Sequence, residues 1–302
     1  MIQPPPFVAG KTRISLGLVC SIGVGAARGG RSNNEDNYLV CRDGRISWRD
    51  GDGEHRTEVA PSASSLVAVA DGMGGHEDGE IASAFAVQAL SRLYVRPSPE
   101  EPEDTLREFL LDAHQRLHAR VAVGGKVKMG TTLTVAWVIE NRLYWAHVGD
   151  SRIYHWRRGR ITRVTRDQTR AEFARRDNRT EPSNPQNLSQ NFIYGSRGLG
   201  NDRGLRIDRG IDTGSFSLQD GDRIVLCTDG LSSRVEDALI ADAIRNVPEP
   251  AACAVTLTER AMAAQSDDNI TALVMRVDRA WDPHDLDPDV GDDDTTLVPP
   301  NA

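Results

Sequence analysis

The chain has 302 residues, of which 39% are hydrophobic and 26% are charged, so its composition is that of a globular protein. Its net charge of -8 is concentrated at one end, because residues 280–302 contain seven Asp and no Lys or Arg. The other 279 residues carry only -1, which excludes a generally basic nucleic-acid binder. No apolar run reaches about 18 residues, so we expect no membrane-spanning helix and no membrane partner.

The first half of the chain predicts strands followed by a pair of helices. Short apolar runs indicate the strands, and apolar residues repeating at helical spacing indicate the helices. Pro97, Pro99 and Pro102 separate the two helices. The expected elements are strands at 14–22, 37–41 and 66–70, a hairpin within the polar stretch 42–62, and helices at 78–95 and 103–122.

The second half predicts many strands, then another helix pair and a last strand. The expected elements are strands at 131–139, 142–148, 152–156, 160–164 and 223–228, helices at 235–246 and 251–265, and a strand at 270–277. This order predicts an α+β fold, with sheets packed together and helix pairs outside. We expect one domain over residues 11–279, a flexible N-terminus at 1–10 and a disordered acidic tail at 280–302.

Aspartates are placed systematically at the ends of the predicted strands. Asp71, Asp150 and Asp229 follow strands, whereas Asp36 and Asp268 precede strands. In antiparallel sheets one edge collects both kinds of strand end, so these carboxylates can converge. Clustered carboxylates repel one another, and hard cations such as Mg²⁺ or Mn²⁺ offset that charge. An alternative stays open at this point, since Asp and Gly also favour ordinary turns.

The loop Asp71-Gly-Met-Gly-Gly75 favours the metal interpretation. Glycine permits close approach of the backbone to a metal or a phosphate, and a helix is predicted to begin near Asp78. The loop is not a P-loop, because no Gly-Lys-Ser/Thr follows it.

Six motifs in one order resemble those of the protein phosphatase 2C family, most closely its bacterial members. The motifs are Arg31-Ser-Asn-Asn-Glu-Asp36, Asp71-Gly-Met-Gly-Gly-His76 with Gly79-Glu-Ile-Ala-Ser83, Gly130-Thr-Thr132, Val148-Gly-Asp-Ser-Arg152, Thr228-Asp-Gly-Leu231 and Asp267-Asp-Asn-Ile-Thr271. The resemblance spans residues 14–278. It implies a β-sandwich flanked by helix pairs and a protein serine/threonine phosphatase with two Mn²⁺ or Mg²⁺ ions.

The resemblance also implies the roles of individual residues. The metal ligands would be Asp36, Asp71, the Gly72 carbonyl, Asp229 and Asp268, with Asp71 bridging both ions and Asp150 joining Asp229 at a weaker third metal. Glu35 would act through metal-bound water, and Arg31 would clamp the substrate phosphate. A metal-bridged hydroxide would attack phosphorus, without a phosphoenzyme.

Two departures from the family pattern concern the third metal and the substrate. Ser233 stands where many members have Asp, which puts part of the third-metal network in doubt. The flap region, about 165–195, matches the family poorly, so the sequence does not reveal the substrate. A fold that binds without turnover is the alternative to an enzyme, and the complete core ligand set speaks against it.

The expected partners are a phosphorylated protein and an opposing bacterial Ser/Thr kinase, and the expected state is a monomer. Four separated cysteines without a CxxC pair indicate a reducing compartment, so we expect a cytoplasmic protein. The arginine-rich stretch 152–179 is either a solvated surface or a site for an acidic partner. The acidic tail is either a solubilising segment or a mask over the active-site face.

Overall fold

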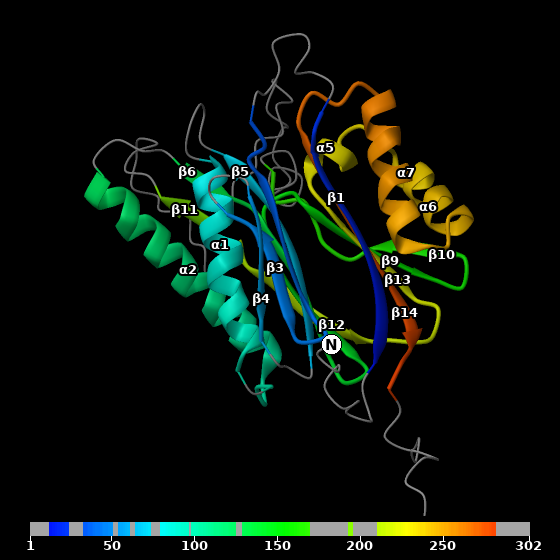
Figure 1. Cartoon of the computed structure of the whole chain (residues 1–302), viewed down its shortest axis with the longest axis horizontal. Coiled ribbons are helices and arrows are strands. Elements are labelled where there is room, and N and C mark those ends of the chain that lie inside the picture. The colour runs from blue at the N-terminus through cyan, green and yellow to red at the C-terminus, as the bar shows by residue number, and fades with distance from the viewer. Residues whose placement is uncertain are drawn as a thin grey trace, which may run out of the picture.

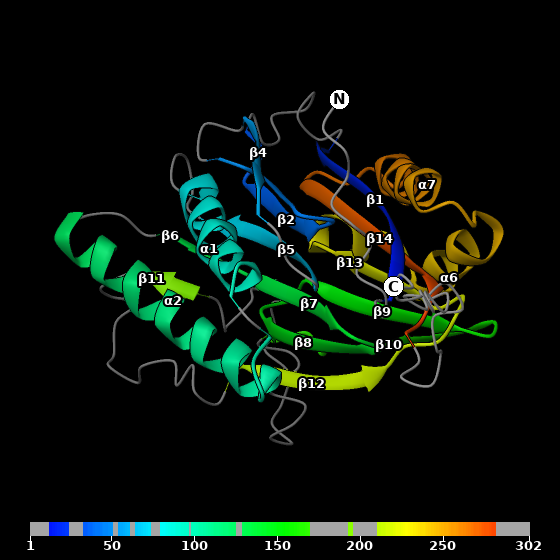
Figure 2. The ribbon, with the colours of Figure 1, turned by 60° about the horizontal axis from the view of Figure 1, so that its bottom comes forward.

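Two antiparallel sheets lie face to face in the computed structural model, and helices cover their outer faces (Figure 1). The structure describes residues 12–23, 33–50, 54–60, 64–73, 79–96, 98–124, 129–169, 193–195 and 210–281. The layers follow the order helix, sheet, sheet, helix, which is the predicted α+β architecture (Figure 2).

The larger sheet has nine strands and the smaller sheet has five. The larger sheet runs in the order β12 (Asp212–Ser217), β8 (Arg142–Val148), β7 (Leu133–Ile139), β5 (Ser65–Met73), β2 (Asp36–Arg42), β3 (Arg45–Arg49) and β4 (His55–Val59), with β6 (Met129–Thr131) pairing both β5 and β11 (Ile193–Gly195). The smaller sheet runs in the order β1 (Arg13–Ile22), β14 (Asn269–Arg279), β13 (Arg223–Cys227), β9 (Arg152–Arg157) and β10 (Arg160–Arg163).

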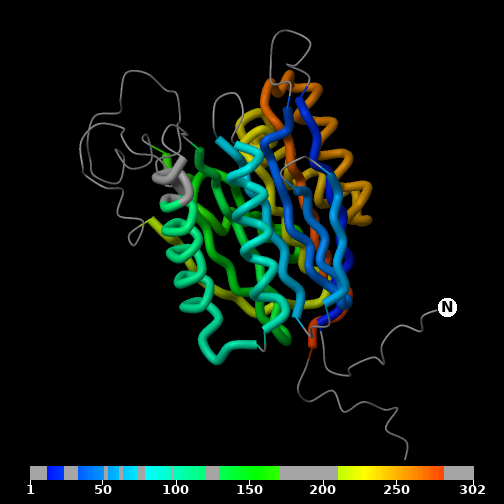
Figure 3. Tube along the Cα trace, turned by 60° about the vertical axis from the view of Figure 1, so that its left-hand side comes forward, coloured from blue at the N-terminus to red at the C-terminus, as the bar shows by residue number. Residues whose placement is uncertain are grey.

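Each sheet carries its own pair of long helices, as the tube in Figure 3 shows. α1 (Gly79–Tyr94) and α2 (Pro102–Gly124) pack on the larger sheet, and α6 (Asp237–Asn246) and α7 (Pro250–Ala263) cover the smaller one. A four-residue helix, α5 (Asp229–Ser232), follows β13. The core therefore has three parts, one between the sheets and one under each helix pair.

Alternation along the strands builds these separate cores. In β14, Ala272 and Val274 pack under the helices, whereas Leu273 and Met275 belong to the core between the sheets. Side chains in a strand point to opposite faces in turn, so a strand that is covered on both sides is apolar throughout. β14 is buried from Asn269 to Met275 for this reason.

Most predicted elements are confirmed, and the exceptions have local causes. The predicted strand 131–139 is divided into β6 and β7 at Thr132, whose backbone N–H donates to the carbonyl of Asp71 at 2.9 Å. β11 and β12 lie in a polar stretch without clear periodicity, and α5 is too short to show a helical repeat. The short gaps between the predicted strands 131–139 and 142–148, and 152–156 and 160–164, are tight turns, with positive φ angles of 53° at Glu140 and 83° at Gly159.

The layer between the sheets changes from apolar to polar toward one end. Val67 and Val69 belong to its apolar centre, and Asp71 shares their strand parity at the end of β5. Ile224 and Leu226 lead in the same way to Thr228. In Figure 1 the end of β5 and helix α5 lie at the upper end, where β14 also begins. Strand parity therefore directs polar side chains from both sheets into one region.

Candidate metal centre

The five predicted aspartates come together at this polar end. We call them the aspartate rim: Asp36 begins β2, Asp71 lies near the end of β5, Asp150 follows β8, Asp229 begins α5 and Asp268 precedes β14. The four other rim carboxylates are the charges that act on Asp71, in the order Asp229, Asp36, Asp268 and Asp150. The convergence expected from the strand ends is thus present.

Asp36 and Asp71 stand directly opposite each other in the β2–β5 pair. Side chains at such positions have Cβ atoms about 5 Å apart, and two like charges there destabilise a sheet. Both residues are buried, with exposed fractions of 2% and 8%. An opposed, buried pair of carboxylates is costly unless protons or a cation offset the charge.

Burial and mutual repulsion shift the acidity of these carboxyl groups. Burial raises the pKa of Asp36 to about 7, and repulsion from Asp268 and Asp229 acts in the same direction. Burial raises the pKa of Asp71 well above its usual value, and the charge of Asp229 adds to this effect. Burial and Asp229 likewise raise the pKa of Asp150, to about 8. The rim as a whole favours the arrival of positive charge.

Asp36 is held by one oxygen only. Its Oδ2 accepts hydrogen bonds from the hydroxyls of Thr228 at 2.8 Å and Thr271 at 2.7 Å. Its Oδ1 is buried and has no hydrogen-bond partner in the described part of the chain. A buried polar atom without a partner costs roughly 1–3 kcal/mol, so a ligand for Oδ1 is expected.

Glycines allow the backbone around Gly72 to pack closely. A Cβ on Gly72 would lie 2.2 Å from the Gly79 carbonyl oxygen and 2.6 Å from that of Glu35. A Cβ on Gly79 would lie 2.6 Å from Oε2 of Glu35. The Glu35 carboxylate therefore lies beside the first residue of α1, where the positive end of the helix dipole favours it. These contacts explain Gly72 and Gly79 as packing requirements beside the rim.

A chain of hydroxyls connects Asp71 to the Asp150 segment. The Thr132 hydroxyl accepts from the Asp71 backbone N–H at 2.9 Å and lies 2.9 Å from the Ser151 hydroxyl. Gly149 has a φ of 116°, and a Cβ there would lie 2.5 Å from Thr132 Cγ2. The Gln168 side chain accepts from the Gly149 N–H at 2.9 Å. These contacts fix the backbone immediately before Asp150.

Asn269 joins the segment before Asp36 to the smaller sheet. Its Oδ1 accepts from the Glu35 N–H at 2.9 Å, and its Nδ2 donates to the Asn33 carbonyl at 3.0 Å. Asn269, Thr228, Thr271 and Thr132 are supporting residues to which the sequence analysis gave no role. Strand parity could have indicated the two threonines, because Thr271 shares a face with Leu273 and Thr228 shares one with Leu226.

The donor chemistry of the rim fits hard divalent cations. Carboxylate oxygens are the ligands of Mg²⁺ and Mn²⁺, and Oδ1 of Asp36 is a buried acceptor in need of a partner. As they stand, the described residues contain no group of three or more His, Cys, Asp or Glu side chains close enough together to hold a metal ion. Mg²⁺ keeps several waters and takes only one or two carboxylates directly.

Several predicted features lie outside the described residues: Arg31, His76, most of the flap and residues 282–302 of the acidic tail. Ser233 is described, and its N–H donates to the Asp229 carbonyl at 2.8 Å. In the arginine-rich stretch, Arg152 pairs with Asp167 at 2.7 Å and Arg157 pairs with Asp222 at 2.5 Å. At least part of this stretch therefore serves the fold.

Comparisons with known proteins give the family of this chain. The family model for protein phosphatase 2C matches residues 51–273. The chain belongs to the protein phosphatase 2C family. The serine/threonine protein phosphatase PstP of Mycobacterium tuberculosis is 34% identical over 221 residues, which cover 72% of this chain and 41% of PstP. The protein phosphatase PhpP of Streptococcus pneumoniae is 28% identical over 250 residues, covering 81% of this chain and 92% of PhpP.

A solved phosphatase 2C-type structure extends the comparison to the fold. The catalytic domain of the serine/threonine protein phosphatase PstP, in complex with two manganese ions, aligns with a TM-score of 0.66 at 29% identity. The alignment covers 87% of this chain and 97% of that domain. The chain spans about two fifths of the full PstP from M. tuberculosis that it matches. No helix among the described residues is long and apolar enough to cross a membrane.

Proposed function

We propose that this protein hydrolyses phosphoserine and phosphothreonine in proteins, with two divalent cations, Mn²⁺ or Mg²⁺, at the aspartate rim. One observation carries the proposal: Asp36 and Asp71 are buried directly opposite each other, with three further carboxylates acting on Asp71. A catalyst that must hold two cations beside a phosphoryl group needs such a concentration of anionic oxygen.

The proposed ligands are Asp36, Asp71, Asp229, Asp268 and the carbonyl of Gly72. When bound, the ions supply an activated water as nucleophile and neutralise charge on the phosphoryl oxygens. Asp71 lies among the other four carboxylates and would contact both ions. Glu35, beside the start of α1, would accept a hydrogen bond from a water of that centre.

Two further assignments depend on the family resemblance. Arg31 would bind the substrate phosphate through its fork of donors, which suits a phosphate dianion. Asp150, with Asp229, would hold a weaker third cation. The charge of Asp229 acts on Asp150, which supports this pairing, while Ser233 provides no carboxylate to it.

We further infer a cytoplasmic enzyme that opposes a Ser/Thr kinase. The four cysteines are free, and Cys41, Cys227 and Cys253 are buried, which suits a reducing compartment. The kinase is inferred from the reaction itself, since a phosphoprotein substrate must be made by phosphoryl transfer to Ser or Thr. Residues 11–279 would form the catalytic domain, acting as a monomer.

The test measures phosphate release from phosphothreonine peptides by the purified chain, with Mn²⁺ and with a chelator. We expect turnover with Mn²⁺, none with chelator and none for Asp229→Ala. The matched control is Asp112→Ala, which removes an exposed aspartate that pairs with Arg116 on α2. No turnover with Mn²⁺ or Mg²⁺ on phosphoserine or phosphothreonine peptides would refute the proposal.

A further inference from the structure

Two threonines of the smaller sheet hold a carboxylate of the larger sheet. Thr228 follows β13 and Thr271 lies in β14, whereas Asp36 begins β2 on the opposite side of the sandwich. All three side chains are buried, and both threonines are fully so. Both hydroxyls reach the same carboxylate oxygen, Oδ2, at 2.8 Å and 2.7 Å.

The surrounding contacts fix the direction of both hydrogen bonds. The Thr228 hydroxyl already accepts from the Thr271 backbone N–H at 3.0 Å, so its own proton is directed to Asp36. The Thr271 hydroxyl also lies 3.2 Å from Cys20 Sγ, its other neighbour among the described residues. Sulfur is a weak acceptor, and a carboxylate is a strong one. The Thr271 proton is therefore also directed to Asp36.

The consequence is an asymmetric carboxylate. With two donors on Oδ2, rotation of the Asp36 side chain would break both hydrogen bonds, so the group is locked in one orientation. Among the described residues, the other oxygen, Oδ1, has no hydrogen-bond partner. In metal sites, outer partners of this kind orient the ligand and raise its affinity for the ion.

We propose that Thr271, assisted by Thr228, is a positioning residue that presents Oδ1 of Asp36 to a divalent cation. This inference rests on the proposed function, because it assumes a cation at the aspartate rim. Thr271 is the better position to test, since within the described residues its hydroxyl contacts Asp36 and Cys20 and supports no backbone group. Thr228 also supports the backbone of β14 and would confound stability with positioning.

A purely structural role is the competing explanation, because the same hydrogen bonds fasten the two sheets together. The two roles differ in what they predict. Fastening predicts a less stable protein whose Mn²⁺ affinity is unchanged once it is folded. Positioning predicts a folded protein whose Mn²⁺ affinity is reduced, and whose activity recovers at high Mn²⁺.

The experiment uses the whole chain, freed of metal and titrated with Mn²⁺ in a calorimeter. The test variant is Thr271→Val, which keeps the shape and removes the hydroxyl, and Thr271→Ser restores the hydroxyl. The matched control is Thr258→Val in α7, where a buried threonine hydroxyl donates to the Ala254 carbonyl at 2.9 Å. Circular dichroism and the melting temperature of each metal-free variant establish that it is folded.

We expect Thr271→Val to bind Mn²⁺ about 10–100-fold more weakly than wild type, which is the usual loss when a hydrogen-bond partner of a metal ligand is removed. We expect Thr271→Ser and Thr258→Val to bind Mn²⁺ within about twofold of wild type. If Thr271→Val does not fold, Thr271→Ala provides the same comparison without added bulk. A folded hydroxyl-free variant with wild-type Mn²⁺ affinity would overturn the inference alone. A wild-type protein that binds no Mn²⁺ would overturn it together with the proposed function.

Discussion

Aspartates flank β13 at both ends, and the two ends surround these carboxylates with opposite charges. At the lower end, Asp222 immediately precedes the strand and is 1% exposed. It accepts hydrogen bonds from Arg157 Nε at 2.7 Å and from the Gln219 N–H at 2.9 Å, and His155 lies 3.3 Å away. At the upper end, Asp229 joins the aspartate rim, where Oδ1 of Asp36 has no hydrogen-bond partner in the part of the chain that the structure describes.

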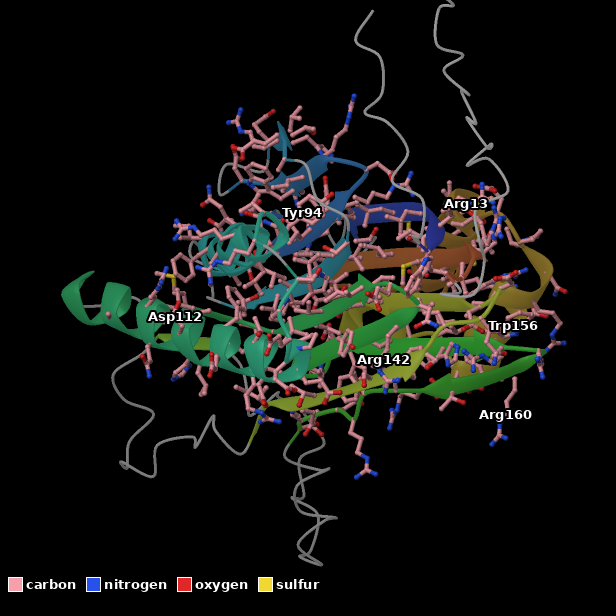
Figure 4. All side chains as sticks on the ribbon, turned by 90° about the horizontal axis from the view of Figure 1, so that it is seen from below. Arg13, Tyr94, Asp112, Arg142, Trp156 and Arg160 are labelled. Carbon is pink, nitrogen blue, oxygen red and sulfur yellow. The ribbon has the colours of Figure 1, made fainter. Side chains whose placement is uncertain are left out.

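The pKa values of the aspartates at the two ends differ accordingly. Hydrogen bonds from Arg157 and His155 outweigh burial and lower the pKa of Asp222 to about 2. Burial and repulsion instead raise the pKa of Asp36 to about 7. A buried carboxylate that pairs with an arginine of the same chain stabilises the fold. Carboxylates that lie together without such a cation repel one another, and a bound metal ion would offset that repulsion. Figure 4 shows the lower end, where Arg13, Arg142 and Arg160 lie near the surface.

The largest effect expected from this difference between the two ends of β13 is on catalysis. We expect Asp71→Asn to lower phosphatase activity by about a thousandfold or more. The change removes a carboxylate from the proposed metal site, whose cations would stabilise the transition state by several kcal/mol. The same change should raise the melting temperature of the metal-free protein by about 2 °C, since it removes one charge from an opposed pair. Phosphate release and calorimetry measure the two effects. A lower metal-free melting temperature would contradict the claim of stored repulsion.

The next effect concerns stability at the opposite end. We expect Asp222→Asn to lower the free energy of unfolding by about 3 kcal/mol, because it leaves Arg157 and His155 without their carboxylate. Urea denaturation measures this value. The matched control is Asp242→Asn, where an aspartate with a 39% exposed side chain pairs with Arg260, so solvent screens the pair and its loss should be much smaller. Equal losses in the two variants would show that Asp222 is no more important than a surface ion pair.

The smallest effect is a pH dependence. The pKa of Asp222 is about 2 in the folded protein, below its ordinary value of 3.8. The folded state therefore binds this proton less readily, and the resulting stability is complete above about pH 5 and is lost as the pH falls toward 2. We expect the stability gap between wild type and Asp222→Asn to narrow by about 2 kcal/mol across that window. A gap that stays constant in urea titrations from pH 5 to 2 would contradict this origin.

The sequence predicts the main elements and the ends at which the rim aspartates converge. Asp71 and Asp229 each follow an apolar run, so their placement can be derived from strand ends. Asp36 lies opposite Asp71 because of the register between β2 and β5. This register depends on the pairing of the two strands, so neither strand's sequence predicts it alone. The hydroxyls on Asp36 come from residues 192 and 235 positions away, so no local pattern contains them.

β12 illustrates a second kind of limit. Its sequence, Asp-Thr-Gly-Ser-Phe-Ser, has little apolar character, because the strand lies at the edge of the larger sheet. Gly214 is required there, since a Cβ would lie 2.8 Å from the ring of Trp145 on the neighbouring strand. Such a strand forms because β8 provides its partner, and composition alone does not indicate it.

The cross-sheet fastening of Asp36 also has a consequence for how the chain folds. A contact between residues 235 positions apart needs a long loop to close before it contributes, so we expect it to form late in folding. A chain with only one sheet in place has neither the oriented Asp36 nor the neighbouring carboxylates of the other sheet. On the proposed function, Mn²⁺ is then captured only after the sandwich has closed. Newly synthesised or damaged chains would thus stay inactive until both sheets have folded and packed together.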